Sequence, residues 1–309
     1  GPGYQAGIWD WLTKNKDEID FAYLNRPHIA IKYIDFIKKN TNIKVIYYGH
    51  DLHFLREYRE YELTGDIQKK RESDYWKSIE FSLMEKAAVS YYPSYVEEEA
   101  IHAIHPEYKI RAITAYVYEK FLENIDKDFE KREGLLFVGG FAHPPNADAV
   151  LWFAKEIFPL IRQKLDVNFY VVGSKVTDEI KALEQPGSGI IVKGFVTEEE
   201  LASLYATSRI VVVPLRYGAG VKGKVVEAVY NGSAIVTTSI GSEGIPEAER
   251  VMKVADGPEA FADEVVKMYE DPTECRRMCE ETQKYIREYF SVEAAWKVIE
   301  GDFTPEKKR

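Results

Sequence analysis

The stretch "RIVVVPLRYGAGVKGKVVEAVYNG", residues 209–232, contains a strand, a glycine-rich loop and a helix in that order. Its run of valines is typical of a strand that is buried on both faces of a parallel sheet. Four similar runs, each followed by a helical pattern, are "GLLFVGG" (134–140), "VNFYVVG" (167–173), "GIIVKGF" (189–195) and "SAIVTTS" (233–239). This alternation predicts an α/β domain built on a parallel sheet.

The helix in this stretch begins with charges that oppose its dipole. Lys222 and Lys224 lie where the aligned peptide groups already place positive charge, and the first turn has no capping side chain and no acidic residue. Gly218 and Gly220 let the backbone approach a ligand closely. A bound phosphate explains both features, because it would accept hydrogen bonds from free amides and ammonium groups together. The alternative is a surface ion pair between Lys224 and Glu227.

A second glycine turn follows the strand at 134–140. Gly139 and Gly140 end that strand, and a helix is expected to begin near Pro145, since proline suits the first helical turn. His143 and Asn146 lie at the mouth of this turn. The pattern is not the G-x-G-x-x-G of dinucleotide-binding folds, which disfavours an oxidoreductase that uses nicotinamide or flavin.

The first part of the chain shows the same alternation of strands and helices. Strands are expected at "FAYLN" (21–25), "KVIYYG" (44–49), "AVSYYP" (88–93) and "IRAITAY" (110–116), and helices within 28–40, 55–87 and 95–104. The charged run "ENIDKDFEKRE" (123–133) lacks apolar periodicity and is the expected linker. We therefore expect Rossmann-like domains at 1–125 and 126–309. The sequence leaves open whether the last helix crosses back to the first domain.

Composition excludes several classes of protein. The net charge of −10 argues against nucleic acid as a partner. Cys275 and Cys279 alone complete neither a zinc site nor a disulfide framework, so we expect reduced thiols in a cytoplasmic protein. No apolar run reaches the ~18–20 residues that would span a bilayer. The initial "GPG" resembles a protease-cleavage scar, which predicts an excised fragment.

Several polar clusters have a simple structural interpretation. His102 and His105 lack a clear third metal ligand and are expected to be structural or solvated. Asp51 is expected to cap the helix that follows it. The "DKD" at 126–128 matches the D-x-D of metal-dependent transferases, but it lies in the charge-rich linker and is expected to be solvated.

Three segments together resemble the family 4 glycosyltransferases of the GT-B fold. They are "VIYYGHDLHFLR" (45–56), "FVGGFAHPPNADAVLWFAKEIFPLI" (137–161) and "VKGFVTEEELASLYATSRIVVVPLRYGAGVKGKVVEAVYNGSAIVTTSIGSEGI" (192–245). The resemblance implies two Rossmann-like domains with parallel sheets that face each other across a cleft. It also implies retaining transfer of a sugar from a nucleotide diphosphate sugar, with no metal and no other cofactor.

The acceptor that this resemblance implies is a glycan or a glycoconjugate such as a lipid-linked glycan, in surface polysaccharide biosynthesis. A peripheral association with a membrane, or a place in a larger polypeptide, is left open. An alternative is a non-catalytic GT-B module that binds a nucleotide sugar or scaffolds a larger transferase.

The resemblance also implies roles for individual residues. Glu227 matches the glutamate that holds both ribose hydroxyls, a bidentate task that suits a carboxylate. Lys224, together with Lys222, matches the cation that neutralises the diphosphate leaving group, which would make both lysines catalytic. His50 in "YGHD" matches a histidine of the first domain that touches the transferred sugar, and it is the third catalytic candidate.

The remaining donor-binding candidates contribute mainly backbone. Gly139 and Gly140 match the glycine turn that approaches the phosphates, and Asn146 lies beside it. Gly194 and Phe195 fall where the family frames the base. Gly218, Ala219 and Gly220 form the loop before the helix, where backbone amides at Ala219 and Gly220 are expected to contact the donor.

Two departures from the family pattern weaken the expectation of catalysis more than that of donor binding. A second glutamate often precedes the ribose-binding one, but Ala219 stands at that position. The sequence before residue 21 is also too short to contain the first strands of that domain, so the first domain is expected to be incomplete.

Overall fold

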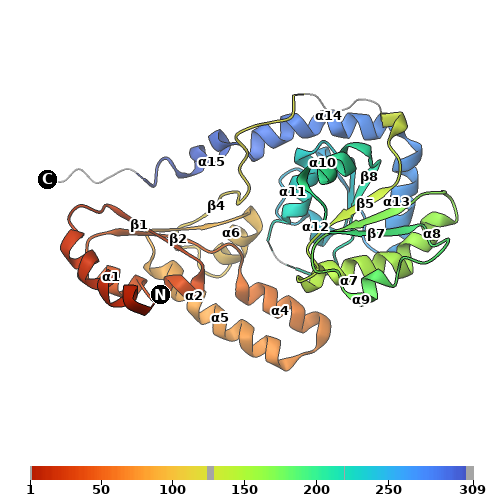
Figure 1. Cartoon of the computed structure of the whole chain (residues 1–309). Helices are drawn as coiled ribbons and strands as arrows, with labels where there is room; N and C mark the ends of the chain where they lie inside the picture. The colour runs from red at the N-terminus through yellow and green to blue at the C-terminus, as the bar shows by residue number, and fades with distance from the viewer. Residues whose placement is uncertain (1, 124–128, 219, 304–309) are drawn as a thin grey trace. The chain divides into compact units, whose positions relative to one another are not determined.

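The computed structural model describes residues 2–123, 129–218 and 220–303, with side chains described from residue 7 onward. The chain forms two compact units: Gly1–Ala115 with Ala295–Arg309, and Tyr116–Ala294 (Figure 1). Each unit contains its own parallel sheet. The α/β class with two parallel sheets, expected from the sequence, is therefore confirmed.

The division between the units differs from the boundary expected at 125/126. That boundary lies within residues 124–128, outside the described part of the chain, whereas the units separate between Ala115 and Tyr116. Phe129, in the expected linker, is only 2% exposed and belongs to the core of the second unit. The guanidinium of Arg132 packs over its ring at 3.9 Å from the centroid. The buried side chain of Phe129 thus fixes this segment to the second unit, although the charged residues around it are typical of a linker.

The first unit has a four-stranded sheet in the order β1-β2-β3-β4 within the described residues. Its strands are β1 (Phe21–Asn25), β2 (Lys44–Tyr48), β3 (Val89–Tyr92) and β4 (Ile110–Ala112). Its helices are α1 (Pro2–Asn15), α2 (Pro27–Ala30), α3 (Ile34–Asn40), α4 (His53–Thr64), α5 (Ile67–Lys86) and α6 (Tyr95–His102). Because successive parallel strands are neighbours, right-handed crossovers place the connecting helices on one face of the sheet.

Alternation along β2 separates the two faces of this sheet. Val45 and Tyr47 pack with the helices α2 to α6, whereas Ile46 and Tyr48 point to the opposite face. On that opposite face the sheet contacts the end of the chain, including Ile299 of the last helix α15 (Val292–Ile299). The question that the sequence leaves open is thereby answered, since the chain from Ala295 onward belongs to the first unit.

The segment expected to be helical at 55–87 forms two helices. α4 and α5 lie side by side as a hairpin, and Gly65 between them adopts a left-handed conformation with φ of 72° (Figure 1). The expectation that Asp51 caps α4 is wrong. The carboxylate of Glu80 on α5 accepts hydrogen bonds from the amides of His53 and Phe54 at 2.9 and 3.2 Å, whereas Asp51 pairs with Arg56.

The second unit has a six-stranded parallel sheet in the order β10-β9-β8-β5-β6-β7 within the described residues. The strands are β5 (Leu135–Val138), β6 (Phe169–Val172), β7 (Ile190–Gly194), β8 (Ile210–Val213), β9 (Ile235–Thr237) and β10 (Lys253–Val254). The chain winds outward from β5 through β6 and β7, then returns to β8 on the other side. The sheet therefore has a topological switch point between β5 and β8, where ligands bind in such folds.

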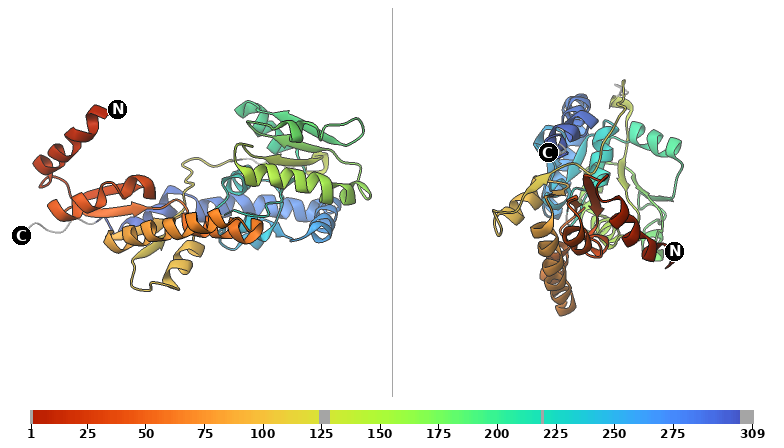
Figure 2. Two further views of the ribbon diagram at one scale, coloured as in Figure 1. Left: turned by 90° about the horizontal axis from the view of Figure 1, so that it is seen from below. Right: turned by 90° about the vertical axis from the view of Figure 1, so that its left-hand side faces the viewer.

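Helices cover the buried strands of this second sheet. They are α7 (Pro144–Trp152), α8 (Phe158–Arg162), α9 (Asp178–Lys181), α10 (Glu198–Thr207), α11 (Gly223–Tyr230), α12 (Ser239–Ser242), α13 (Pro258–Glu270) and α14 (Pro272–Tyr289). Short 3₁₀ turns lie at Phe129–Lys131 and Ala248–Arg250. A π-helical turn, Phe153–Ile157, joins α7 to α8 as one continuous helical segment (Figure 2).

Candidate functional site

A pocket of about 360 Å³ lies at the carboxyl ends of the central strands of the second unit. It is lined by residues that follow β5, β6 and β7 and by two side chains of α11. The lining residues are Val138, Gly139, Gly140, Asn146, Val172, Gly173, Ser174, Phe195, Val196, Leu201, Lys224 and Glu227. Six of the expected site residues, far apart in the sequence, thus line one pocket.

The glycine turn after β5 packs tightly against two polar side chains. A Cβ atom at Gly139 would lie 3.0 Å from Nδ2 of Asn146 and 3.1 Å from Cε of Lys224. Asn146, only 5% exposed, donates through Nδ2 to the carbonyl oxygen of Gly140 at 2.7 Å. The absence of a side chain at Gly139 therefore allows α7 and α11 to bring these two groups together at the turn.

Lys224 carries the positive charge of this pocket. Its ammonium donates to Oδ1 of Asn146 at 2.5 Å and lies 5.6 Å from the centroid of the Phe137 ring. Burial, and then the neighbouring charge of Lys222, lowers the pKa of Lys224 to about 8, although Glu227 acts in the opposite direction. A partly buried cation with a depressed pKa favours an anionic ligand, because an anion would compensate its lost hydration.

The start of α11 is uncapped, as the sequence predicts. The N-cap residue is Lys222, with no side-chain hydrogen bond to the helix and no acidic residue in the first turn. The Lys222 ammonium donates instead to the carbonyl oxygen of Gly220. The first-turn amides of α11 and the Lys224 side chain therefore belong to the same short segment, as an anion site would require.

Glu227 lies one turn further along α11 and is partly buried. Burial raises the pKa of its carboxyl group, while Lys224 and the phenol of Tyr205 lower it. The Asn231 amide packs against the same helix turn by donating to the Glu227 backbone carbonyl at 2.9 Å. Glu227 thus presents a carboxylate to the pocket beside a cation.

Several lining residues were not predicted from the sequence. Ser174 follows β6, and Val196 and Leu201 follow β7 on the same side of the sheet. These residues could be assigned to the pocket only once the strand order, which puts β6 next to β5 and β7 next to β6, was known. Phe195, which was predicted, lines the same part of the pocket and is 81% exposed, so its ring is available for contact with a ligand.

Other predicted donor residues do not line this pocket. Gly194 ends β7 with φ of 70°, and Gly218 and Gly220 adopt φ of 139° and 73° in the loop before α11. Lys222 likewise lies at the start of α11 outside the lining set. Ala219 lies outside the described residues. The positive φ values explain the glycines at these positions, because other residues rarely adopt them.

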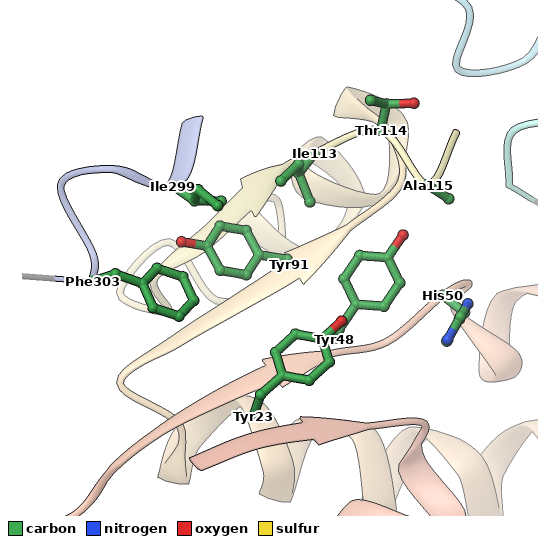
Figure 3. Close-up of a pocket in the computed structure, with 9 residues that line it drawn as sticks. All are labelled: Tyr23, Tyr48, His50, Tyr91, Ile113, Thr114, Ala115, Ile299 and Phe303. Atoms are coloured by element: carbon green, nitrogen blue, oxygen red, sulfur yellow. The ribbon is translucent and has the colours of Figure 1, made fainter. Parts of the chain in front are cut away.

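His50 lies in the first unit, where it lines a separate pocket of about 380 Å³ (Figure 3). Figure 3 shows the rings of Tyr23 and Tyr48 side by side near it, at a centroid separation of 6.4 Å. His50 has φ of 68°, and its Nε2 lies 2.5 Å from Oδ1 of Asn25. Burial, then the charge of Arg26, lowers the pKa of His50, which favours a neutral imidazole at neutral pH.

The remaining polar clusters serve packing. His102 pairs with the carbonyl of Tyr108, and His105 pairs with Glu107. Cys275 and Cys279 are buried free thiols on α14, as expected. The described residues contain no cluster of three His, Cys, Asp or Glu side chains that could hold a metal ion. The "DKD" at 126–128 lies outside the described residues.

Residues 132–271 match the family described as "Glycosyl transferases group 1". This match lies within the second unit and covers slightly less than half of the chain. The matched segment extends from the strand before the glycine turn to the end of α13 and contains every residue that lines the pocket at the carboxyl ends of β5 to β7.

Solved glycosyltransferase structures have the same fold. Sucrose-phosphate synthase from Thermosynechococcus elongatus is 16% identical with a TM-score of 0.76, over 98% of this chain and 77% of that chain. HepE from Anabaena, in complex with UDP, is 12% identical with a TM-score of 0.68, over 96% of this chain and 81% of that chain. These similarities confirm the GT-B fold.

A curated relative of this chain comes from Klebsiella pneumoniae. It is described as an "uncharacterized 44.6 kDa protein in cps region" and is 32% identical over 116 residues. The matched stretch covers 36% of this chain and 30% of the relative. In the described part of the chain, no helix combines the length and apolar character needed to cross a bilayer.

Proposed function

We propose that the pocket at the carboxyl ends of β5 to β7 binds a nucleotide diphosphate sugar, whose sugar the enzyme transfers with retention of configuration and without a metal ion. One observation carries this proposal. Within a single pocket, the glycine turn at Gly139 and Gly140, the partly buried ammonium of Lys224 and the carboxylate of Glu227 lie together. The UDP bound in the HepE structure supports a nucleoside diphosphate as the ligand class.

The arrangement suits the charge changes of glycosyl transfer. Transfer breaks the bond from the anomeric carbon to the β-phosphate oxygen and forms a bond from the acceptor oxygen to that carbon, while the acceptor hydroxyl loses its proton. Negative charge therefore grows on the leaving diphosphate. The Lys224 ammonium and the positive end of the α11 dipole would stabilise this growing charge. Lys222 would add a second positive charge beside them.

Other residues that line the pocket suit the nucleoside. A carboxylate accepts hydrogen bonds only, so Glu227 is suited to two neighbouring ribose hydroxyls. In the same pocket, the exposed ring of Phe195 and the apolar side chains of Val196 and Leu201 offer surfaces against which a base can stack. Gly194 would let the backbone come close to that base. The donor would therefore extend from Lys224 toward Phe195.

The acceptor is proposed to be a glycan or a lipid-linked glycan in surface polysaccharide assembly. The relative from the cps region supports this context. His50 is proposed to contact the transferred sugar from the first unit, with a neutral imidazole that can accept a hydrogen bond from a hydroxyl.

Calorimetric titration tests donor binding. UDP-glucose, GDP-mannose and dTDP-glucose are titrated against the wild type, Glu227→Ala and the control Glu199→Ala, which removes an exposed carboxylate on α10. We expect one donor to bind the wild type and the control equally and Glu227→Ala about 10- to 100-fold more weakly. No binding of any donor at millimolar concentration would refute the donor site.

Turnover separates the enzyme from a non-catalytic GT-B module. The donor that binds is incubated with the wild type and Lys224→Ala, and release of the nucleoside diphosphate is followed with and without candidate glycan acceptors. Loss of release in Lys224→Ala that exceeds its loss of ground-state binding would support the leaving-group role. Tight donor binding with no release under any condition would favour the module.

A further inference from the structure

The geometry points to Asn146 as a positioning residue, which acts on the diphosphate through Lys224 rather than by touching the donor. This inference rests on the proposed donor site, and it differs from the direct donor contact expected from the sequence. It follows from the two hydrogen bonds of one buried side-chain amide.

The orientation of the Asn146 amide is determined by its partners. Nδ2 can only donate, and it donates to the carbonyl oxygen of Gly140 at 2.7 Å. Oδ1 must therefore point the other way, where it accepts from the Lys224 ammonium at 2.5 Å. Both partners line the same pocket. The Asn146 amide thus links the glycine turn to the Lys224 ammonium. Its nitrogen and its oxygen are each engaged in one of these two hydrogen bonds.

The hydrogen bond to Asn146 leaves the other N–H groups of the Lys224 ammonium available to a phosphate. An ammonium group has three donors, and Asn146 accepts from one of them. The ring of Phe137 and the close contact between Cε and Gly139 confine the side chain on other sides. A long, flexible lysine is thereby held in one place before the donor arrives, which reduces the entropy lost when the donor binds.

Among the polar side chains around Lys224, Asn146 is the uncharged one. Lys222 and Glu227 are its charged neighbours, both from the segment of α11, whereas β5 contributes the ring of Phe137 and α7 contributes the Asn146 amide. A neutral acceptor holds the ammonium without cancelling its charge. An aspartate at this position would instead pair with Lys224 and repel a diphosphate.

A double-mutant cycle tests the inference. The dissociation constants of UDP, GDP and dTDP are measured by calorimetry for the wild type, Asn146→Ala, Lys224→Ala and the double variant, and the tightest ligand is used. We expect Asn146→Ala to weaken binding roughly 5- to 50-fold in the wild-type background and less than about 2-fold in the Lys224→Ala background. Equal losses in both backgrounds would show that Asn146 acts independently of Lys224 and would overturn the inference.

The pH dependence supplies a second readout that a purely structural role would not produce. Asn146→Ala removes a hydrogen bond to the charged form of Lys224, so the alkaline fall in affinity should move to lower pH. Asn146→Asp adds a negative charge beside the same group, so the fall should move to higher pH while affinity at neutral pH is lower. Shifts in the same direction for both variants, or no shifts, would contradict the inference.

Folding is controlled separately because Asn146 is buried. Asn168→Ala removes an exposed amide just before β6, at the amino end of that strand, whereas the pocket lies at the carboxyl ends. It serves as the matched control and should bind like the wild type. If Asn146→Ala does not fold, the Asn146→Asp variant alone decides by the direction of its pH shift. Absence of binding to the wild type would instead refute the proposed donor site itself.

Discussion

At the scale of single residues, the pKa of Lys224 makes donor binding dependent on pH. Burial and Lys222 lower this pKa to about 8, so the apo site loses its ammonium charge as the pH rises through this value. A diphosphate prefers the charged form. We expect affinity for a UDP-sugar to be highest below about pH 8 and to fall by up to about 10-fold per pH unit above it. Calorimetry between about pH 7 and about pH 9.5 measures this dependence.

Proton uptake provides the control for this first prediction. Because bound diphosphate would raise the pKa of Lys224, binding near pH 8 should take up a fraction of a proton, seen as a binding enthalpy that changes with the ionisation enthalpy of the buffer. A UDP-sugar is a suitable probe, since its phosphate esters do not titrate in this range. Lys224→Ala should show neither the pH dependence nor the proton uptake. If either effect persists in that variant, a group other than Lys224 is responsible for it.

The residue scale also shows what the sequence could reveal about the site. Lys224 and the glycines were predictable because each conflicts with a local rule: the lysine opposes a helix dipole, and the glycines interrupt a regular pattern. Glu227 was identified through the family resemblance. Ser174 breaks no local rule, and it enters the pocket only because β6 lies beside β5. Asn146 was predicted near the turn, but its contact with Lys224, 78 residues away, depends on tertiary packing.

At the scale of elements, the carboxyl ends of β5 and β6 approach each other closely. This approach requires a glycine at one position of the turns for packing, whereas a second glycine has more room beside it. A Cβ atom at Gly173 would lie 1.9 Å from the carbonyl oxygen of Gly139, whereas one at Gly140 would meet only Oγ of Ser174, at 3.4 Å. We expect Gly173→Ala to lower the free energy of unfolding by more than about 2 kcal/mol and Gly140→Ala to change it by less than about 0.5 kcal/mol. Urea denaturation measures both.

The same pair of variants separates stability from binding. If the backbone at Gly140 approaches the diphosphate, Gly140→Ala should weaken donor binding although its stability is unchanged. Normal binding by Gly140→Ala would show that the donor does not come close to this residue. A fully stable Gly173→Ala would indicate that β5 and β6 separate easily at their carboxyl ends.

A second element-scale prediction concerns the capping of α4 by a distant carboxylate. Glu80 is fully buried and accepts from two backbone amides and from Nδ1 of His53. Glu80→Ala would leave the two backbone amides without this partner and should lower the free energy of unfolding by about 2–4 kcal/mol. Glu85→Ala removes an exposed carboxylate from the same helix and should cost less than about 0.5 kcal/mol. Equal effects of the two variants would contradict the capping role.

The error about Asp51 has a physical explanation at this scale. Sequence rules assign a cap to the nearest acidic residue, and Asp51 stands two residues before α4. In the fold, Arg56 attracts that carboxylate at 2.5 Å, and Glu80 reaches the helix start from α5. The strands and helices themselves were largely predictable because their apolar periodicity is local. Capping partners from another element were not.

At the scale of the whole molecule, the sequence predicts two α/β domains but not which segment completes each of them. Apolar runs identify the strands of both sheets. The end of the chain, however, follows the second unit in sequence and packs on the first. Its contacts include those of Asp302, a residue only 9% exposed, whose environment no local pattern reveals.

Asp302 should therefore stabilise the first unit selectively. Its carboxylate accepts from the phenol of Tyr91 at 2.6 Å and pairs with Lys109 and Arg111 at 2.6 and 3.0 Å. Hydrogen bonds from Lys109 and Tyr91 outweigh the effect of burial and lower the pKa of this carboxyl group, so its contribution to stability is lost as the pH falls through the folded-state value. In Asp302→Ala, the end of the chain should detach more easily from the sheet.

Hydrogen exchange followed by mass spectrometry measures this effect in the full chain. Asp302→Ala should lose protection in β2 and β3, by about 1–3 kcal/mol of local opening free energy, while β5 and β8 keep theirs. Glu300→Ala, an exposed neighbour on the same segment, should leave all four strands unchanged. The expected pattern requires that the end of the chain protect the sheet of the first unit. Equal loss of protection in both units would instead mean that Asp302 stabilises the two units as one cooperative body.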